Sequence, residues 1–129
     1  MGYALAQAAL DRGAVVTLVT TPTALPTPVG AARVDVGTAA EMCQVVLEEQ
    51  EACDVLVMAA AVADYRPAQA EARTIKKGPG GLNLQLERTA DILVEVARER
   101  ERCGRPAVVV GEHPAGPEVD LHRQNALGR

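Results

Sequence analysis

Short segments rich in valine alternate along this chain with longer segments whose apolar residues recur at helical spacing. The pattern predicts strands over residues 14–20, 34–36, 54–58 and 107–110, separated by helices. The strands over residues 14–20, 54–58 and 107–110 are expected to be buried. Strands that alternate with helices form parallel sheets through right-handed crossovers. Only two of the 129 residues are aromatic, so the core must consist of Val, Leu, Ala and Ile, as in parallel sheets covered by helices. The sequence therefore predicts one compact α/β domain.

Three helices are predicted from apolar spacing and from capping residues. The first covers residues 2–12, has Leu5, Ala8 and Ala9 on its inner face, and ends at Gly13. It has no strand before it, which is unusual in an α/β chain. Thr38 and Glu41 form a capping-box pattern at the start of the second helix. The third helix is predicted to begin after a Thr89 cap and to run to about Arg102. The inward positions of these two helices are Ala39, Met42, Cys43, Val46, Leu47, Ile92, Leu93, Val96 and Ala97.

Three segments lack a helical pattern. Prolines make residues 21–30 a loop, and residues 66–81 are polar and interrupted. Leu82, Leu84 and Leu86 then alternate with polar residues, which predicts a half-exposed strand. After Gly111 no apolar periodicity remains. We therefore expect a domain over residues 1–111 and a disordered or loosely docked tail over residues 112–129.

Charge and composition exclude several classes of protein. The formal net charge is −4 and no basic face is evident, so nucleic acid is not expected as a partner. No apolar stretch reaches the roughly 20 residues of a membrane span, and no signal peptide is recognisable. The three cysteines have no C-x-x-C spacing and are expected to be reduced and buried. These features predict a cytoplasmic protein.

The run of small residues over 59–64 is the strongest candidate for a binding site. It follows a predicted strand, and ligands of parallel sheets bind outside the carboxyl ends of the strands. Asp64 could accept a hydrogen bond from a ligand or hold Mg²⁺, or it could only cap a loop. The alanines could also be small only because a helix packs on them. Residues 89–92 form a second candidate, because a helix start can bind polar groups, although Asp91 could merely stabilise its own helix.

Other chemical motifs are weak or missing. The sequence contains no glycine-rich dinucleotide fingerprint, P-loop, nucleophile elbow or H-E-x-x-H zinc motif. Lys76 and Lys77 are the two lysines of the chain, and they suit either an anionic ligand or a solvated loop. His113 and His122 have no acidic partner at a fixed spacing and are expected at the surface.

Four segments share one resemblance: residues 59–67 (AAAVADYRP), 75–77 (IKK), 82–84 (LNL) and 91–93 (DIL). They resemble the phosphopantothenate–cysteine ligase (phosphopantothenoylcysteine synthetase) domain of coenzyme A biosynthesis. Supporting matches lie in residues 1–6, 13–19 and 38–42, and the resemblance covers residues 1–111. It implies a Rossmann-like domain that dimerises through an arm after the alanine-rich strand. In bacteria this domain is usually fused behind a flavin-dependent decarboxylase.

The resemblance also implies an activity and a set of site residues. Bacterial members use CTP and Mg²⁺ to join 4′-phosphopantothenate to cysteine through an acyl-cytidylate, with release of pyrophosphate and then CMP. The nucleotide would be bound by Met58, Ala59, Ala60, Asp64, Ala90, Asp91, Ile92 and Leu93. The helix start over residues 90–93 would contact the cytosine through backbone groups. Lys76 and Lys77 would be possible phosphate contacts, and no protein metal site is implied.

The chain departs from the family pattern at several positions. The nucleotide-binding lysine of the family's K-I-K-K motif is Thr74 here, which cannot neutralise a phosphate, although Arg73 could compensate. The family's first strand, which would precede Met1, is missing. Residues 111–116 (GEHPAG) stand where the family has G-F-A-A-E-T. We therefore expect a fragment truncated at both ends, with a possible frame shift after Gly111. Its activity would then be lost, and the alternative is a non-catalytic remnant that binds a nucleotide or only dimerises.

Overall fold

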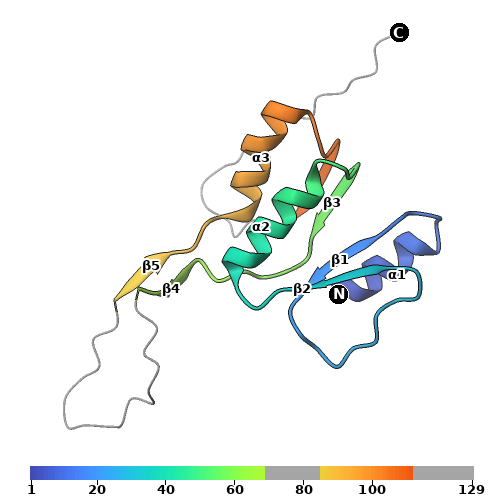
Figure 1. Ribbon diagram of the computed structural model, residues 1–129, viewed down its shortest axis with the longest axis horizontal. Coiled ribbons are helices and arrows are strands. Elements are labelled where there is room, and N and C mark those ends of the chain that lie inside the picture. Colours follow the sequence, from blue (N-terminus) through green and yellow to red (C-terminus); the bar gives the residue numbers. More distant parts are fainter. Residues whose placement is uncertain (69–84, 112–129) are drawn as a thin grey trace.

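The protein, seen in a computed structural model, is an α/β structure of helices and short strands. Residues 1–68 and 85–111 are described. The elements, drawn in Figure 1, are α1 (Gly2–Leu10), β1 (Thr17–Thr20), β2 (Ala32–Asp35), α2 (Ala39–Gln50), β3 (Val55–Met58), β4 (Tyr65–Pro67), β5 (Leu86–Arg88), α3 (Ile92–Cys103) and β6 (Val108–Gly111). The predicted α/β class is therefore confirmed.

The described strands form three separate two-stranded sheets. β1 pairs with β2 and β3 pairs with β6, both in parallel, as the alternation of strands and helices predicted. Val57 lies opposite Val110, and Met58 lies opposite Gly111. The third sheet is the antiparallel pair of β4 and β5, which projects away from the helices in Figure 1.

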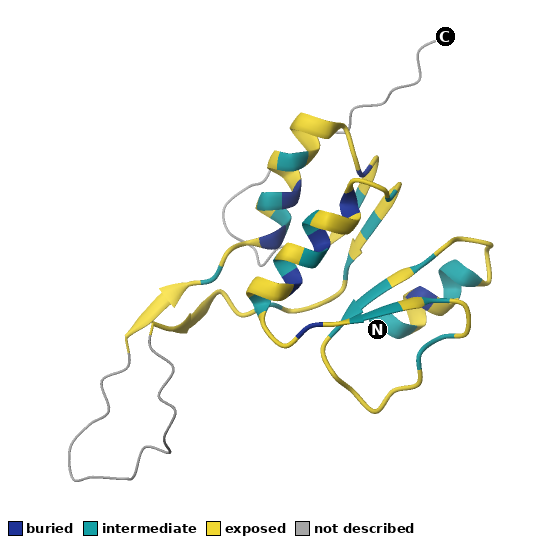
Figure 2. Ribbon diagram, viewed as in Figure 1, coloured by how far each residue is buried: buried dark blue, intermediate teal, exposed yellow. Residues whose placement is uncertain are grey.

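Helices α2 and α3 form the centre of the described core. They lie side by side over one face of β3 and β6 (Figure 1), and their buried residues are the dark blue bands of the ribbon in Figure 2. Val96 is fully buried, and it clusters with Val36, Met42, Val46 and Ile92. Leu56, Met58 and Val109 pack against this cluster from the sheet. The predicted inward residues of α2 and α3 are buried or half-buried, except Ala97, which is exposed.

The opposite face of β3 and β6 is open within the described part of the chain. Val55, Val57, Val108 and Val110 are each about half exposed, at 49–54%. Because side chains alternate along a strand, one face of each strand packs on the helices while the other points away. The expectation of fully buried strands is therefore wrong for β3 and β6.

The start of α2 agrees with its predicted capping box. The Glu41 amide donates to Oγ1 of Thr38 (3.1 Å), and Oε2 of Glu41 accepts from the Gly37 amide (2.7 Å). At the other end of the core, Gly104 caps the C-terminus of α3, and its φ of 74° is left-handed and suits glycine.

The predicted cap of α3 is wrong by two residues. Oδ1 of Asp91 accepts from the amides of Leu93 (3.0 Å) and Val94 (3.2 Å), so Asp91 is the N-cap. The Thr89 amide instead donates to the backbone oxygen of Asp64 (2.8 Å). That bond continues the pairing of β4 with β5, so residue 89 still belongs to the extended segment.

Several other boundaries and faces differ from those predicted. β1 begins at Thr17 rather than residue 14, because the Ala14 amide closes the end of α1 on the Ala9 oxygen (3.1 Å). β2 begins at Ala32, two residues before the predicted start. On α1 the buried residue is Ala6, whereas Leu5 is 43% exposed.

The arm begins with the short pair of β4 and β5. Their antiparallel register places Arg66 opposite Glu87, and Nε of Arg66 lies 2.7 Å from Oε1 of Glu87. Residues 65–67 were not predicted as a strand. Leu86 lies in β5, whereas Leu82 and Leu84 fall outside the described residues.

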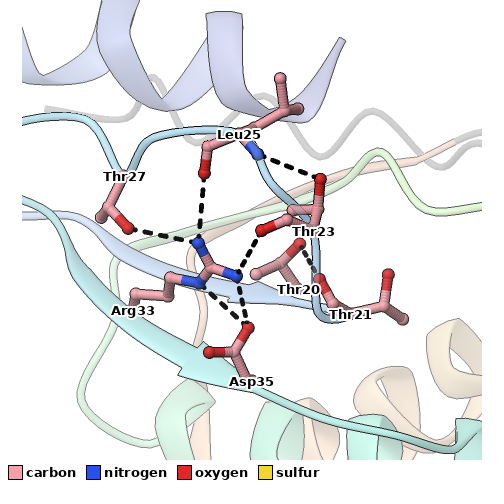
Figure 3. Close-up of polar contacts among 7 residues, drawn as sticks. All are labelled: Thr20, Thr21, Thr23, Leu25, Thr27, Arg33 and Asp35. Atoms are coloured by element: carbon pink, nitrogen blue, oxygen red, sulfur yellow. Dashed lines mark hydrogen bonds and ion pairs between the residues drawn. The ribbon is translucent and has the colours of Figure 1, made fainter.

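The proline-rich loop of residues 21–31 is held by one arginine of β2. As Figure 3 shows, the Arg33 guanidinium donates to the backbone oxygens of Leu25 (3.3 Å) and Thr23 (3.5 Å) and to Oγ1 of Thr27 (3.4 Å). It also lies 2.7 Å from Oδ1 of Asp35. The hydrogen bond to Asp35 raises the pKa of Arg33. The prolines of the loop have no backbone N–H groups to donate, so the loop can form few hydrogen bonds of its own. The planar guanidinium has several N–H donors, and these can hold the loop through its oxygen atoms instead.

Replacing Arg33 with glutamine should loosen this loop without unfolding the domain. The loop contacts are long, so we expect thermolysin to cut within residues 21–31 about fivefold faster, as mass spectrometry of the fragments would show. Arg12→Gln is the matched control, because within the described part of the chain the Arg12 guanidinium donates only to the Ala8 oxygen (2.8 Å). Equal cleavage of the two variants would contradict the bracing role of Arg33.

Candidate functional site

A cavity of about 530 Å³ lies at the carboxyl end of β3, beside the start of α3. Its size is in the usual range for small-molecule sites. The chain after β3 forms one wall with residues 58–64, and residues 89–93 form another, with Met1 at the edge. The eight residues that the sequence proposed for nucleotide binding all line this cavity: Met58, Ala59, Ala60, Asp64, Ala90, Asp91, Ile92 and Leu93. Two segments that lie about 30 residues apart in the sequence thus meet in space.

The alanines of this wall are exposed rather than covered by a helix. Ala59, Ala60, Ala61 and Ala63 are all exposed among the described residues. A Cβ built on Gly2 would lie 3.7 Å from Cβ of Ala59, so α1 begins close to this run without burying it. Within the described part of the chain, packing against a helix therefore does not explain the small side chains.

The start of α3 offers fewer amides than the sequence suggested. The Asp91 carboxylate accepts from the Leu93 and Val94 amides, and the Glu95 amide donates to the Asp91 backbone oxygen (3.1 Å). The carboxylate also places a negative charge at the positive end of the helix dipole. This end of the cavity is therefore suited to neutral polar groups of a ligand more than to an anion.

The charge of the described lining is negative. Asp64 and Asp91 contribute carboxylates, and none of the described side chains around the cavity is a lysine or arginine. Asp64 is exposed, and its carboxylate makes no hydrogen bond to residues 1–68 or 85–111. A single accessible carboxylate suits a Mg²⁺ ion that a ligand brings with it, because Mg²⁺ commonly uses one or two carboxylates together with phosphates and waters.

Several predicted functional residues cannot be placed in this cavity. Thr74, Lys76 and Lys77 lie outside the described residues, as do His113 and His122. Within residues 1–68 and 85–111, no group of three or more His, Cys, Asp or Glu side chains could hold a metal ion. In the same ranges, no helix is long and apolar enough to cross a membrane.

The three cysteines are free thiols. Cys43 and Cys53 are half-buried, and burial raises the pKa of both. Cys103 is exposed, and its Sγ lies 3.4 Å from the Arg105 backbone oxygen. The expectation that all three are buried is therefore wrong for Cys103, because the last turn of α3 extends beyond the core.

A second hollow, of about 470 Å³, lies between α1 and the proline-rich loop, and sequence reasoning did not predict it. Tyr3, Ala4, Gln7 and residues 25–29 line it. The Tyr3 hydroxyl is buried without a hydrogen-bond partner among the described residues. The lining contains no carboxylate, lysine, arginine or histidine, so it offers little for catalysis.

Five lining residues of the main cavity were not among the eight proposed for nucleotide binding: Met1, Ala61, Val62, Ala63 and Thr89. Ala61, Val62 and Ala63 belong to the run that was singled out, so the whole run was the available signal. Thr89 reaches the cavity because its amide is tied to Asp64. No local pattern indicates a contact between Met1 and residues about 60 positions further on.

The sequence profile of one protein family matches residues 1–112, and its description is DNA/pantothenate metabolism flavoprotein C-terminal domain. Similar proteins carry the name coenzyme A biosynthesis bifunctional protein CoaBC. The one from Bacillus subtilis is 42% identical over 102 residues, which cover 78% of this chain and 25% of the relative. The one from Vibrio cholerae is 42% identical over 131 positions, which cover 100% of this chain and 32% of the relative.

A protein of the same name from Mycobacterium bovis is 46% identical over 101 residues, or 77% of this chain and 24% of that protein. The chain thus spans a quarter to a third of these relatives. A crystal structure of the C-terminal domain of such a CoaBC protein superposes with a TM-score of 0.62 at 38% identity. It covers 75% of this chain and 44% of the crystallised one.

Proposed function

Since this chain belongs to the DNA/pantothenate metabolism flavoprotein C-terminal domain family, we propose that it acts in coenzyme A biosynthesis. The proposed reaction is the CTP-dependent joining of 4′-phosphopantothenate to cysteine, in the cytoplasm. The observation that carries the proposal is the cavity in which residues 58–64 meet residues 89–93. Those are the two segments on which the expected nucleotide site depended.

The charges around the cavity suggest how CTP would be oriented. A triphosphate is disfavoured beside two carboxylates, whereas the neutral base and ribose fit a wall of alanines and backbone groups. The base would then face residues 90–92, and the phosphates would extend past Asp64. Asp64 would hold the Mg²⁺ that accompanies the phosphates, and this ion would reduce their charge during nucleophilic attack.

The proposed chemistry has two steps. A carboxylate oxygen of 4′-phosphopantothenate attacks the α-phosphorus of CTP, and the bond to the β-phosphate breaks to release pyrophosphate. The cysteine amine then attacks the carbonyl carbon of the acyl-cytidylate, loses a proton and displaces CMP, which forms the amide. The described residues would contribute by positioning, which is the main requirement of phosphoryl-group chemistry.

A second candidate function is a non-catalytic member of the family that binds a nucleotide or only dimerises. Thr74 stands where the family has a cationic lysine, and the described lining supplies no replacement charge. The projecting β4–β5 pair favours a dimer through this arm, because Tyr65 and Leu86 there are 51% and 56% exposed. The relatives' name suggests fusion to a second enzyme, as in the decarboxylase arrangement expected from the sequence.

Titration calorimetry with CTP and Mg²⁺ tests the first step of the proposal. We expect CTP to bind and UTP or ATP to bind less well, because residues 90–92 would face the base. Pyrophosphate release with 4′-phosphopantothenate then separates the two candidates. Release by the unmodified chain supports the enzyme, whereas release only by Thr74→Lys supports the non-catalytic form. A chain that binds no CTP would rule out the nucleotide-binding role.

A further inference from the structure

Gly111 lies behind the wall of the main cavity and does not itself line it. It is the last residue of β6 and pairs with Met58 of β3. A Cβ built on Gly111 would lie 2.8 Å from Cδ1 and 3.3 Å from Cδ2 of Leu93, and 3.3 Å from Cβ of Met58. Carbon atoms in contact prefer about 3.5–4.0 Å, so a methyl group fits here only if the end of the Leu93 side chain moves.

Space, rather than backbone conformation, requires a glycine at this position. The described glycines with a positive φ are Gly13, Gly30 and Gly104, and Gly111 is not among them. An alanine could therefore adopt the same backbone conformation without strain. Its methyl group could not shift toward β3, because Cβ of Met58 is fixed by the paired strand. The end of the Leu93 side chain would have to move instead.

Leu93 and Met58 both line the cavity. The isobutyl group of Leu93 lies over Gly111, and Leu93 is also the residue whose amide is held by Asp91. We propose that Gly111 is a positioning residue of the nucleotide site, which keeps Leu93 seated over β6 and so maintains the wall between β3 and α3. This inference rests on the proposed nucleotide-binding function.

Gly111→Ala should therefore weaken CTP binding through Leu93. We expect a roughly tenfold higher Kd for CTP with Mg²⁺, because the added methyl group would push the Leu93 side chain out of its place in the cavity wall. Gly37→Ala is the control, since a Cβ there would meet only Oε2 of Glu41 at 3.4 Å, an ordinary contact away from the cavity. Its Kd should equal that of the unmodified chain.

A double substitution separates this role from a general loss of stability. Leu93→Ala removes the group that Gly111→Ala displaces, so the double variant should bind CTP as Leu93→Ala alone does. Additive losses would contradict the inference. The ¹³C shifts of the Leu93 methyl groups, measured without ligand, should change in Gly111→Ala and stay unchanged in Gly37→Ala.

The methyl measurement also separates this inference from the proposed function. If the unmodified chain binds no CTP but the Leu93 methyl shifts change in Gly111→Ala, the nucleotide proposal fails while the control of Leu93 by Gly111 stands. Unchanged methyl shifts, or CTP binding by Gly111→Ala equal to that of the unmodified chain, would overturn the inference.

Discussion

Replacing Val96 with aspartate should abolish the cooperative unfolding transition of the chain or lower its Tm by about 15 °C. Val96 is 0% exposed and lies in the cluster that joins α3 to α2 and to the sheet. A carboxylate there would be buried among Val36, Met42, Val46 and Ile92 without a hydrogen-bond donor in the cluster. Such a change costs about 4 kcal/mol or more, which is a large part of the stability of a small domain.

The matched control for this prediction is Val94→Asp on the same helix. Val94 is 40% exposed, and an acidic residue in the first turn of α3 agrees with the helix dipole. Thermal unfolding followed by circular dichroism should give a Tm within a few degrees of the unmodified chain for Val94→Asp. For Val96→Asp, either no transition or a Tm about 15 °C lower is expected. Similar Tm values for the two variants would show that α3 does not pack as described.

Replacing Asp64 with asparagine should remove most of the Mg²⁺-dependent binding of CTP. The substitution keeps the shape of the side chain and leaves the bond between the Asp64 backbone oxygen and the Thr89 amide intact. It removes the accessible carboxylate of the cavity, since the Asp91 carboxylate is engaged at the start of α3. Loss of one charged contact corresponds to a roughly tenfold to hundredfold higher Kd.

Asp54→Asn is the matched control at the opposite end of β3. Asp54 is paired with Arg105 at 2.8 Å, and both side chains are largely exposed, so this ion pair contributes little to stability. Calorimetry should show unchanged CTP binding for Asp54→Asn. In EDTA, Asp64→Asn should bind CTP as the unmodified chain does. A loss that persists in EDTA would mean that Asp64 contacts the nucleotide directly instead of holding the metal.

Local patterns were sufficient for most of the secondary structure. The capping residue of α2 was predicted because its Thr and Glu stand at the required spacing, and the structure confirms it. The cap of α3 was predicted at Thr89, and the structure shows Asp91. Both residue types can cap a helix, and the choice depends on the strand pairing that holds Thr89 to Asp64. That pairing joins residues about 25 positions apart in the sequence, so no local signal contains it.

The candidate site, too, was predicted from the sequence only in part. The run over residues 59–64 and the helix start at residues 90–93 were each identified from residue type and position, and both line the cavity. Sequence could not show that the alanines are exposed, or that the Asp91 side chain occupies two of the helix amides. It also could not distinguish a glycine needed for space from one needed for a turn, as Gly111 and Gly104 illustrate.

The sequence by itself determined the α/β class, the order of helices and strands apart from β4, and the two segments that line the cavity. These properties depend on hydrophobic periodicity and on residues close together in the chain. Only the tertiary structure decided that β1 and β2 form a sheet apart from β3 and β6, and that four valines are exposed on one face. It also decided which groups surround the cavity and which residue supports Leu93. Those outcomes depend on contacts between distant segments, whose free energies are set by packing and mutual burial rather than by local preference.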